Sequence, residues 1–388
     1  MKTKRFSIIA ILIIVAVLAT ACAGETAAPA ATPGGTAATT TATAKPSVTA
    51  QPAAKIYKWT IQGGQDVPGG LFFKVMEGSF ANIVEELSGG RLIFNMHGPG
   101  ELVPYADMTA SVQQGTLDAT VNAGYYDIGR DTKAALVSII PFGLTSSEYP
   151  LWYKFYGGEQ AWKDVYNPWN IEPYYIGCGG AQILGQTRDK YNSMQEWKDK
   201  GLVVRSSGLQ AYVYQEAGFE TVFVSGGELF TAMERGVIDI VEYAGAFWNY
   251  TMGYHEIAPW IYGPGWHENA TGICLFANKD KVAELPEDLK IILKWAAEAE
   301  ASVMGPGLME LEIASMEKLD EYLTTSGKGG WIRIPDSDMA MMYDARDRMA
   351  AKQAEKDPEF GRVFQTILDC KEDYAAIDQR IGDLSFER

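Results

Sequence analysis

Residues 225–269 read SGGELFTAMERGVIDIVEYAGAFWNYTMGYHEIAPWIYGPGWHEN, and this stretch repeats the pattern of an earlier one. Residues 100–124 read GELVPYADMTASVQQGTLDATVNAG. Both copies contain Gly-Glu-Leu and then Gly-x-x-Asp-x5-Gly, formed by Gly115, Asp118 and Gly124 in the first copy and by Gly236, Asp239 and Gly245 in the second. A duplicated supersecondary unit with different residues at its tip predicts two related lobes that face one site.

Short β-branched runs alternate with helical patterns around both copies. Expected strands cover 56–61, 91–96, 118–122, 174–177, 202–205, 221–224, 237–241 and 272–277, and expected helices cover 72–87, 105–114, 193–198, 209–217 and 228–235. This alternation is typical of an α/β fold with a mostly parallel sheet. The chain is also too long for one ordinary core, which again favours two lobes.

The chain is expected to cross between the lobes more than once, which gives a hinge of several strands. We assign residues 55–178 and about 272–310 to the first lobe, and about 179–271 and 311–388 to the second. A long helical stretch near the C-terminus runs from Pro286 to about Leu323, and we expect Gly305-Pro306-Gly307 to interrupt it.

The N-terminus predicts export. Lys2, Lys4 and Arg5 precede an apolar run over 8–18 that is too short to span a membrane, so residues 1–21 read as an export signal. Ala19-Thr20-Ala21-Cys22 resembles a bacterial lipobox, with Leu18 one place early, and lipidation of Cys22 is the favoured outcome. Cleavage after Ala21 by an ordinary signal peptidase is the alternative.

Residues 22–54 predict a disordered tether behind this anchor. After Cys22 the segment is almost wholly Ala, Thr, Pro, Gly and Ser, which cannot form a core. A flexible chain of this length spans roughly 30 Å. The protein is therefore expected at the outer face of the cytoplasmic membrane or in the periplasm.

Composition excludes several classes of partner and framework. The formal net charge is −16, and it becomes −19 once the three basic residues of the signal are removed. Such an acidic protein is a poor ligand for nucleic acids or anionic lipid surfaces. Beyond Cys22 the cysteines are Cys178, Cys274 and Cys370, an odd set that predicts buried thiols rather than a disulfide framework. Among the tryptophans, we expect Trp59, Trp197, Trp260 and Trp295 in the core.

Arg205 is the first candidate binding residue. It ends an expected strand and precedes Ser206-Ser207-Gly208 and a helix, where its guanidinium can offer a bidentate fork to a carboxylate. Position alone is equally compatible with a solvated surface arginine.

Glu242 and Glu268 follow strands within an aromatic-rich span, and two carboxylates in one cleft repel unless a cation or a shared proton compensates. Gln182, in the glycine-rich loop 177–182, adds another oxygen donor. Oxygen donors suit Na⁺, Ca²⁺ or Mg²⁺ rather than zinc. Ordinary solvated glutamates are the alternative. The histidines, among them His267, show no ligand spacing.

The runs GGELFTAMERGVIDIVEYAG and GYHEIAPWIYGPGWHEN resemble the solute receptors of TRAP (tripartite ATP-independent periplasmic) transporters, in the branch that binds 2-oxo acids and small hydroxy acids. The resemblance implies a two-lobed periplasmic-binding-protein-like fold. It places Gln182, Glu242 and Glu268 on a cation, Na⁺ or Ca²⁺, and Arg205 on the ligand carboxylate. Tyr243 stands where the family has a tryptophan whose backbone carbonyl binds the cation.

Further residues are expected near the ligand: Tyr125, Tyr126 and Gln65 from the first lobe, and Trp248 from the second. The resemblance implies a receptor, not an enzyme, that delivers a small carboxylate such as pyruvate or lactate to a membrane permease. The branch includes homodimers joined through their C-terminal helices, for which residues 286–323 are the candidates here, and a monomer is the alternative. An ABC-importer or sensor-associated receptor, and a hydrolase built on the carboxylate pair, are the alternatives.

Overall fold

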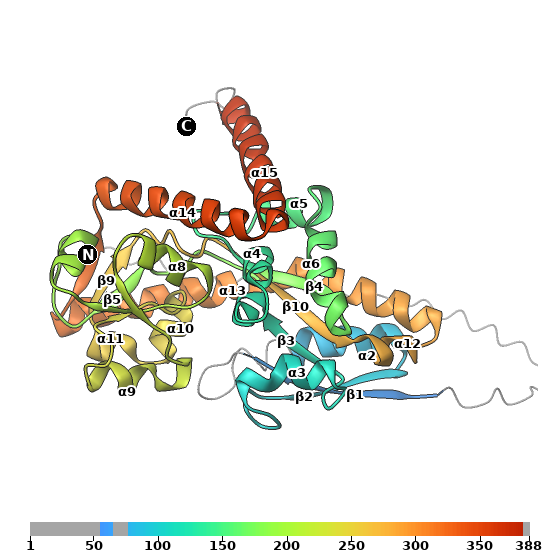
Figure 1. The fold of residues 1–388 in the computed structure, drawn as a ribbon. Helices are drawn as coiled ribbons and strands as arrows, with labels where there is room; N and C mark the ends of the chain where they lie inside the picture. Colours follow the sequence, from blue (N-terminus) through green and yellow to red (C-terminus); the bar gives the residue numbers. More distant parts are fainter. Residues whose placement is uncertain (1–54, 65–76, 383–388) are drawn as a thin grey trace, which may run out of the picture. The chain divides into compact units, whose positions relative to one another are not determined.

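Two mixed β-sheets with helices around them organise the chain (Figure 1). The computed structural model describes residues 55–64 and 77–382, so Gln65, Cys22, the export signal and the tether lie outside the described residues. The described residues belong to one compact unit that begins at Ala53.

The first sheet has the strand order β2-β1-β3-β10-β4. Its strands are β1 (Tyr57–Gly63), β2 (Leu92–His97), β3 (Ala119–Ala123), β4 (Ile171–Gly179) and β10 (Thr271–Asn278). Strand β1 pairs in parallel with β2 and β3, whereas β10 is antiparallel to both β3 and β4. The sheet is therefore mixed, because the chain returns from the second sheet as β10 and inserts between two earlier strands.

The second sheet has the order β11-β9-β5-β8-β6-β7. Its strands are β5 (Gly185–Thr187), β6 (Val203–Arg205), β7 (Glu220–Val222), β8 (Ile240–Val241), β9 (Trp260–Gly263) and β11 (Gly330–Arg333). Strand β5 is antiparallel to β8 and β9, and the other pairs are parallel. The predicted two-lobed α/β fold is confirmed, but both sheets contain antiparallel pairs beside the expected parallel ones.

The helices are α2 (Asn82–Ser88), α3 (Met108–Gln113), α4 (Thr132–Ser138), α5 (Glu148–Phe155), α6 (Gly158–Tyr166), α7 (Met194–Asp199), α8 (Gly208–Glu216), α9 (Leu229–Glu234), α10 (Ala246–Thr251), α11 (Tyr254–Ile257), α12 (Lys279–Ala283), α13 (Glu287–Ser326), α14 (Asp336–Lys356) and α15 (Pro358–Gly382). Helices α2, α3, α7, α8 and α9 end within one residue of their predicted ends, whereas α13 continues a little beyond its predicted end at about Leu323. Gly89 closes α2 in the left-handed conformation with φ 60°, as a glycine after a helix commonly does. Ser193 caps α7 by accepting from the backbone N–H of Glu196 at 3.0 Å. Short turns η1 (Glu77–Ala81), η2 (Tyr105–Asp107), η3 (Gly124–Asp127), η4 (Asn167–Trp169) and η5 (Gly226–Glu228) complete the set.

The repeated sequence unit forms the same structure twice. Asp118 accepts from the backbone N–H of Thr60 at 2.7 Å, and Asp239 accepts from that of Val203 at 2.9 Å. Each aspartate thereby ties the turn before β3 or β8 to the neighbouring parallel strand. Turns η2 and η5 lie at the same distance along the chain before Gly115 and Gly236. The two Gly-Glu-Leu motifs lie at different distances before these glycines. The Gly-Glu-Leu part of the predicted repeat is therefore coincidental.

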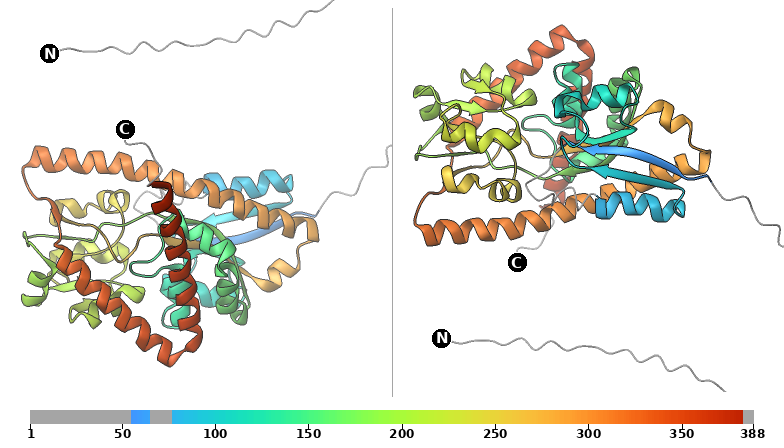
Figure 2. Two further views of the ribbon diagram at one scale, coloured as in Figure 1. Left: turned by 90° about the horizontal axis from the view of Figure 1, so that it is seen from above. Right: turned by 90° about the horizontal axis from the view of Figure 1, so that it is seen from below.

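Helix α13 passes through Gly305-Pro306-Gly307 without interruption, which corrects the expected break. A proline inside a helix removes one backbone hydrogen bond, but packing on both sides supports this one. Met304 and Leu308 lie in the core of the first sheet, while Leu319 packs with Ile261 of the second sheet and with Ile183 of the segment before β5. Figure 2 shows α13 running beside both sheets.

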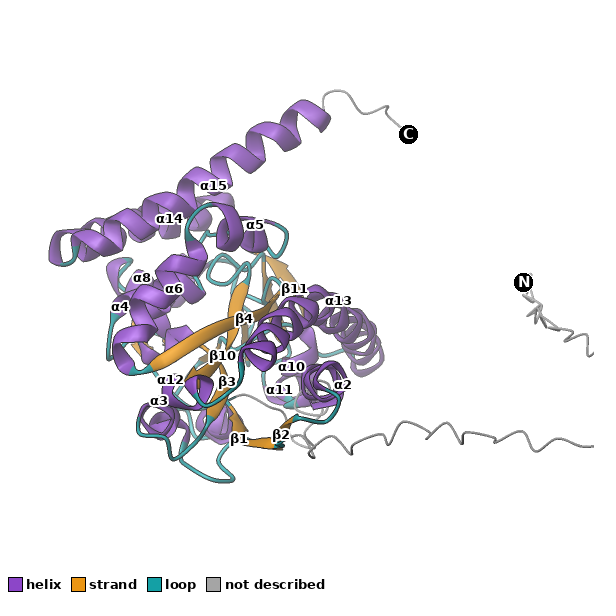
Figure 3. Ribbon diagram, turned by 90° about the vertical axis from the view of Figure 1, so that its right-hand side faces the viewer, coloured by secondary structure: helices purple, strands orange, loops and turns teal. Residues whose placement is uncertain are grey.

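Helices α14 and α15 form a V (Figure 2), and the end of α15 points away from the sheets (Figure 3). Helix α14 packs on α8, and the start of α15 packs on α4 and α5. The three cysteines beyond residue 54 are free and buried, as predicted. Trp59 and Trp197 are buried, but Trp295 is 61% exposed on α13, contrary to expectation. Among the described residues, no helix combines the length and apolar character needed to cross a membrane.

Candidate functional site

Arg205 is a buried arginine at the end of β6. Only 2% of it is exposed, and its Nη1 donates to the backbone carbonyl of Glu242 at 3.0 Å and lies 3.5 Å from the carboxylate. Its Nε donates to the carbonyl of Val224 at 3.1 Å. The guanidinium also lies over the rings of Phe223 and Tyr243, at 5.6 and 5.3 Å. These contacts fix the plane of the fork, so its remaining edge is oriented before any ligand arrives.

Glu242 follows β8 directly and is fully buried. Its Oε1 lies 3.2 Å from His267 Nε2, without the alignment of a hydrogen bond. Burial alone would raise the pKa of Glu242, but His267 and Arg205 outweigh it and hold that pKa below its usual value. The carboxyl of Glu242 therefore favours the ionised form.

Glu268 completes a buried cluster with Glu242 and His267. One ligand atom from each of the three lies within 4.8 Å of the others. Burial, and then the charge of Glu242, raise the pKa of Glu268 well above its usual value. Its carboxylate accepts a short hydrogen bond from the hydroxyl of Thr271. Two acidic groups so close together favour a state in which Glu268 keeps a proton, unless a cation takes its place.

Gln182 joins this cluster through the backbone. Its N–H donates to the carbonyl of Glu268 at 3.1 Å, while its buried side-chain Oε1 has no hydrogen-bond partner among the described residues. Glu242 Oε1 is likewise unpartnered. Buried acceptors without donors are costly. Their oxygen chemistry therefore fits a hard cation such as Na⁺ or Ca²⁺, which takes oxygen ligands.

The predicted boundary of about 179–271 assigns all four of these residues to the second lobe, but they lie on two kinds of segment. Arg205 and Glu242 sit at strand ends of the second sheet, whereas Gln182 and Glu268 lie in the two segments that link the sheets, β4 to β5 and β9 to β10. The donors therefore gather where the chain crosses between the sheets.

Two cavities reach this region. The arginine cleft, of about 240 Å³, is lined by Tyr105, Tyr126, Arg205, Phe223, Gly226 and Tyr243, with neighbouring glycines and proline. The α13 chamber, of about 510 Å³, includes Tyr125, Gln182, Tyr243, Trp248 and Glu268 in its wall. Cavities of these volumes can hold a small ligand or part of one.

Tyr125 and Tyr126, the candidate residues of the first lobe, each line one of the two cavities. The rings of Tyr125 and Tyr126 lie 4.2 Å apart, one facing the chamber and the other the cleft. A Cβ on Gly208, next to the Arg205 strand, would lie 3.2 Å from Tyr125 Cβ. Trp248 lies beside Gln182 and Glu268 in the chamber wall rather than beside Arg205.

Sequence reasoning missed three residues of this region. No spacing along the chain marks His267 as a metal ligand, yet its ring contacts the acidic cluster. Phe223 and Tyr105 line the arginine cleft, and Tyr105 donates to Asn122 Oδ1 at 3.0 Å. Tyr105 occupies the place in the first repeat that Gly226 has in the second. Alignment of the two repeats on Gly115 and Gly236 is the signal that finds it.

Phe142 and helix α15 support the loop that carries Glu268. Phe142 stacks on Trp266 with ring centres 5.6 Å apart, and its N–H donates to the Trp266 carbonyl at 2.7 Å. Lys371 of α15 donates to the carbonyls of Phe142 and Gly143 at 2.6 and 2.9 Å. The C-terminal helix thus supports the segment that presents His267 and Glu268.

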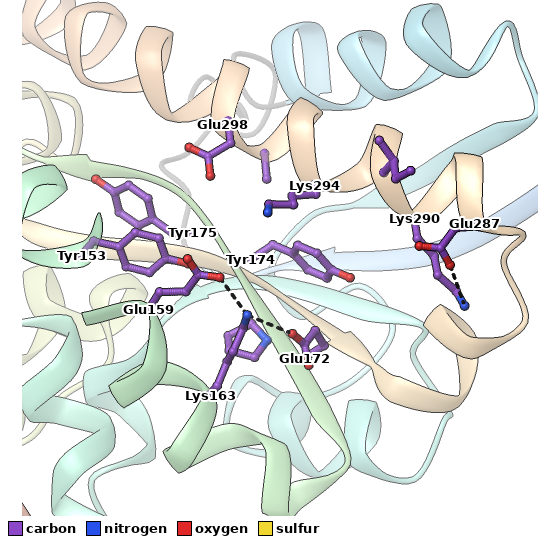
Figure 4. Close-up of a pocket in the computed structure, with 13 residues that line it drawn as sticks. Tyr153, Glu159, Lys163, Glu172, Tyr174, Tyr175, Glu287, Lys290, Lys294 and Glu298 are labelled. Carbon is purple, nitrogen blue, oxygen red and sulfur yellow. Dashed lines mark hydrogen bonds and ion pairs between the residues drawn. The ribbon is translucent and has the colours of Figure 1, made fainter. Parts of the chain in front are cut away.

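A further cavity, of about 250 Å³, lies between α6, the edge strand β4 and α13, and Arg205 does not line it (Figure 4). Lys163 there lies 2.7 Å from Glu159 and 3.9 Å from Glu172, and Lys290 lies 3.9 Å from Glu287. These paired charges cover the open edge of β4, which suits protection against edge pairing. No predicted site residue lines this cavity.

Residues 73–357 match the model of bacterial extracellular solute-binding protein family 7 (DctP). The chain belongs to this family. It is therefore a solute-binding protein and not an enzyme, and the carboxylate-pair hydrolase is set aside. Its family also marks it as an exported protein.

Named relatives support this membership. The chain is 28% identical over 313 residues to the monocarboxylate 2-oxoacid-binding periplasmic protein all3028 of a Nostoc species, which covers 79% of this chain and 82% of the relative. Its fold resembles a TRAP periplasmic solute-binding protein of Colwellia psychrerythraea crystallised with calcium and pyruvate, at 28% identity and TM-score 0.78, over 84% of this chain and 97% of the other. A TRAP protein of Pseudoalteromonas atlantica with sodium and pyruvate gives 27% identity and TM-score 0.77, over 86% and 100%. These relatives favour the TRAP prediction over an ABC-importer or sensor role.

Proposed function

We propose that this solute-binding protein captures a small organic carboxylate, a 2-oxo acid such as pyruvate or the hydroxy acid lactate, together with Na⁺ or Ca²⁺. The observation that carries the proposal is the buried Arg205 fork beside an acidic cluster in which Glu242 Oε1, like the neighbouring Gln182 Oε1, has no hydrogen-bond donor among the described residues. The 2-oxoacid-binding relative and the pyruvate-bound structures support the ligand class.

The cation would be held by the side-chain oxygens of Gln182, Glu242 and Glu268 and by the backbone carbonyl of Tyr243. When bound, it supplies positive charge that offsets both buried carboxylates and attracts the ligand's oxygens. His267 lies against Glu242 and limits where that carboxylate can move.

The ligand carboxylate would meet the edge of Arg205 that faces the arginine cleft. Among the described residues no hydrogen bond reaches Nη2, while Nε and Nη1 are already engaged. The guanidinium lies over the rings of Phe223 and Tyr243, and Tyr126 of η3 lines the same cleft. Tyr243 is smaller than the tryptophan that the family resemblance implies, so it leaves room for a different ligand size.

Closure of two lobes over the ligand would be a population shift that contacts to both lobes favour. Our lobe boundaries remain 55–178 with about 272–310 and about 179–271 with 311–388. The linking segments at Gln182 and Glu268, and helix α13, would be the parts that bend.

The closed receptor would deliver its ligand to a TRAP membrane permease from the outer face of the cytoplasmic membrane, anchored by lipid at Cys22. A homodimer is also proposed, because helical apolar side chains remain exposed near the C-terminus. Ile291, Trp295 and Ile313 of α13 and Ile377 of α15 are each more than half exposed. Mass spectrometry of the native protein tests the lipid, and light scattering tests the dimer.

Calorimetry of Arg205→Ala tests the carboxylate site. Removal of one partner from a buried charge pair costs about 3–5 kcal/mol, so pyruvate affinity should fall by more than a hundredfold. Arg333→Ala, at a side chain that is 75% exposed, is the matched control. Near-normal affinity in a folded Arg205→Ala protein would refute the assignment.

A thermal-shift panel tests the cation and the ligand class together. Pyruvate, longer 2-oxo acids, lactate and a sugar acid should each be run with Na⁺, with Ca²⁺ and with chelator in sodium-free buffer. We expect the shift produced by the preferred acid to disappear without cation. A shift that survives complete removal of both ions would exclude the role of Gln182, Glu242 and Glu268.

A further inference from the structure

The two cavities at the site expose different binding residues. One exposes the residue proposed to bind the organic acid, and the other exposes residues proposed to bind the cation. Arg205 faces the arginine cleft, whereas Gln182 and Glu268 face the α13 chamber. Among the described lining residues, Tyr243 alone belongs to both. The carboxylate anchor and two of the cation donors are therefore reached from different cavities.

The α13 chamber extends from the protein surface to these donors. Met309 and Met316, which line it, are 48% and 37% exposed, and Ala181 of the linking loop is exposed as well. Glu268 and Thr271 in the same wall are buried. The chamber therefore has an outer end on α13 and an inner end at the acidic cluster.

Glu312 places a carboxyl group between these ends. It lies on α13 one turn from both Met309 and Met316, so the three share a helix face. Its Oε2 accepts from the backbone N–H of Phe247 at 3.1 Å, which holds the group in the chamber wall. Burial raises the pKa of Glu312, while backbone donors at residues 246 and 247 favour its ionised form. A hard cation that passes through the chamber would therefore find an oxygen ligand at the carboxyl group of Glu312.

We propose that the α13 chamber is the route by which the cation enters and leaves its site, separate from the cleft through which the organic acid reaches Arg205. The inference rests on the proposed cation site. It implies that the cation exchanges even when the acid occupies the arginine cleft. The alternative occupant is the apolar tail of a larger 2-oxo acid, because the chamber wall also contains Trp248, Ile273 and Leu308.

Terbium luminescence in stopped flow tests the route. Tb³⁺ is mixed with the mature protein, and its release is followed after addition of chelator, with and without saturating pyruvate. Met309→Trp and Met316→Trp narrow the outer end of the chamber. Ile313→Trp is the matched control, since Ile313 is on the same helix, is 56% exposed and does not line the chamber.

We expect either narrowing variant to slow Tb³⁺ entry and release by the same factor, about tenfold or more, which a modest rise in barrier supplies. The equilibrium affinity for Tb³⁺ and the association rate of pyruvate should stay as in the control. Melting temperatures establish that each variant is folded, and one folded variant is sufficient.

Three results would overturn the route. Unchanged Tb³⁺ rates, with release blocked by pyruvate, would place cation exchange in the arginine cleft. Unchanged Tb³⁺ rates with lost affinity for 4-methyl-2-oxopentanoate but not pyruvate would assign the chamber to a ligand tail. Absence of Tb³⁺ binding in the unsubstituted protein, or binding that Glu242→Gln leaves intact, would remove the proposed cation site and the route with it.

Discussion

Glu300 on α13 gives the protein a calculable dependence of stability on pH. The residue is 1% exposed, and its Oε1 accepts from the hydroxyl of Ser79 at 2.9 Å. Its Oε2 has no partner among the described residues. Burial raises its pKa to about 7, from the ordinary value of 4.5 that we take for the unfolded chain. The folded protein therefore keeps this proton over a range in which the unfolded chain has lost it.

The direction of the effect follows from that difference. Below about pH 4.5 both states are protonated, and Glu300 leaves the free energy of unfolding unaffected. As the pH rises to about 7, ionisation favours the unfolded chain, and stability falls. Each pKa unit corresponds to about 1.4 kcal/mol, so a shift of this size lowers the free energy of unfolding by about 3 kcal/mol above pH 7.

Glu300→Gln should remove this dependence, because glutamine does not ionise and its Oε1 still accepts from Ser79. Urea unfolding at pH 5, 6, 7 and 8 measures the free energy of each protein. The difference between the variant and the unsubstituted protein should move by about 2.5 kcal/mol in favour of the variant across that range, because the unfolded chain is already largely ionised at pH 5. Glu310→Gln, at an exposed position of the same helix, is the control. Parallel curves for all three proteins would refute the reasoning.

Three further predictions follow from contacts at and near the site. Because burial raises the pKa of Glu268, cation affinity should fall as the pH is lowered, and calorimetry in buffers of different ionisation enthalpy should detect proton release; identical heats would contradict this. Lys371→Met removes the donor to the Phe142 carbonyl, and we expect about tenfold weaker cation binding with little change in melting temperature. Unchanged cation affinity would show that the loop with Glu268 keeps its position without Lys371. Asp239→Ala leaves the Val203 N–H without its side-chain acceptor and should cost about 1–3 kcal/mol in urea unfolding, whereas a neutral result would deny the repeat its structural role.

Local patterns of sequence account for most of the fold. Alternating strands and helices have short-range signals, and Gly115 and Gly236 mark the equivalent turns of the repeat with φ of 78° and 69°. The strand directions were less accessible, because β10 reaches its place between β3 and β4 only after the whole second sheet. The expected break at Pro306 failed for a related reason: contacts with both sheets outweigh the hydrogen bond that the proline removes.

The candidate site was predictable in part. The chemistry of the side chains suggests oxygen donors at Glu242 and Glu268. The family resemblance then favours a cation-binding role for them over that of solvated surface groups. Both are buried, and the structure places them together. His267 escaped notice because its role depends on its distance from Glu242 in space, and no spacing along the chain encodes that distance. Phe223 contacts Arg205 from the end of a neighbouring strand, which is likewise a property of the sheet.

The position of the donors links cation binding to the geometry of the two sheets. Gln182 and Glu268 are joined by a backbone hydrogen bond between the segments that cross from one sheet to the other, whereas Glu242 is fixed to the second sheet through Arg205. A cation that binds all three would tie the crossing segments to β8. Such a tie holds only while the segments keep one arrangement, so cation affinity differs between arrangements of the lobes, and the cation favours the one it binds best. The organic acid would act on the same balance from the Arg205 side, since Tyr126 of η3, which follows β3 of the first sheet, lines that cleft. Cation and acid should therefore strengthen each other's binding by equal factors, as thermodynamic linkage requires.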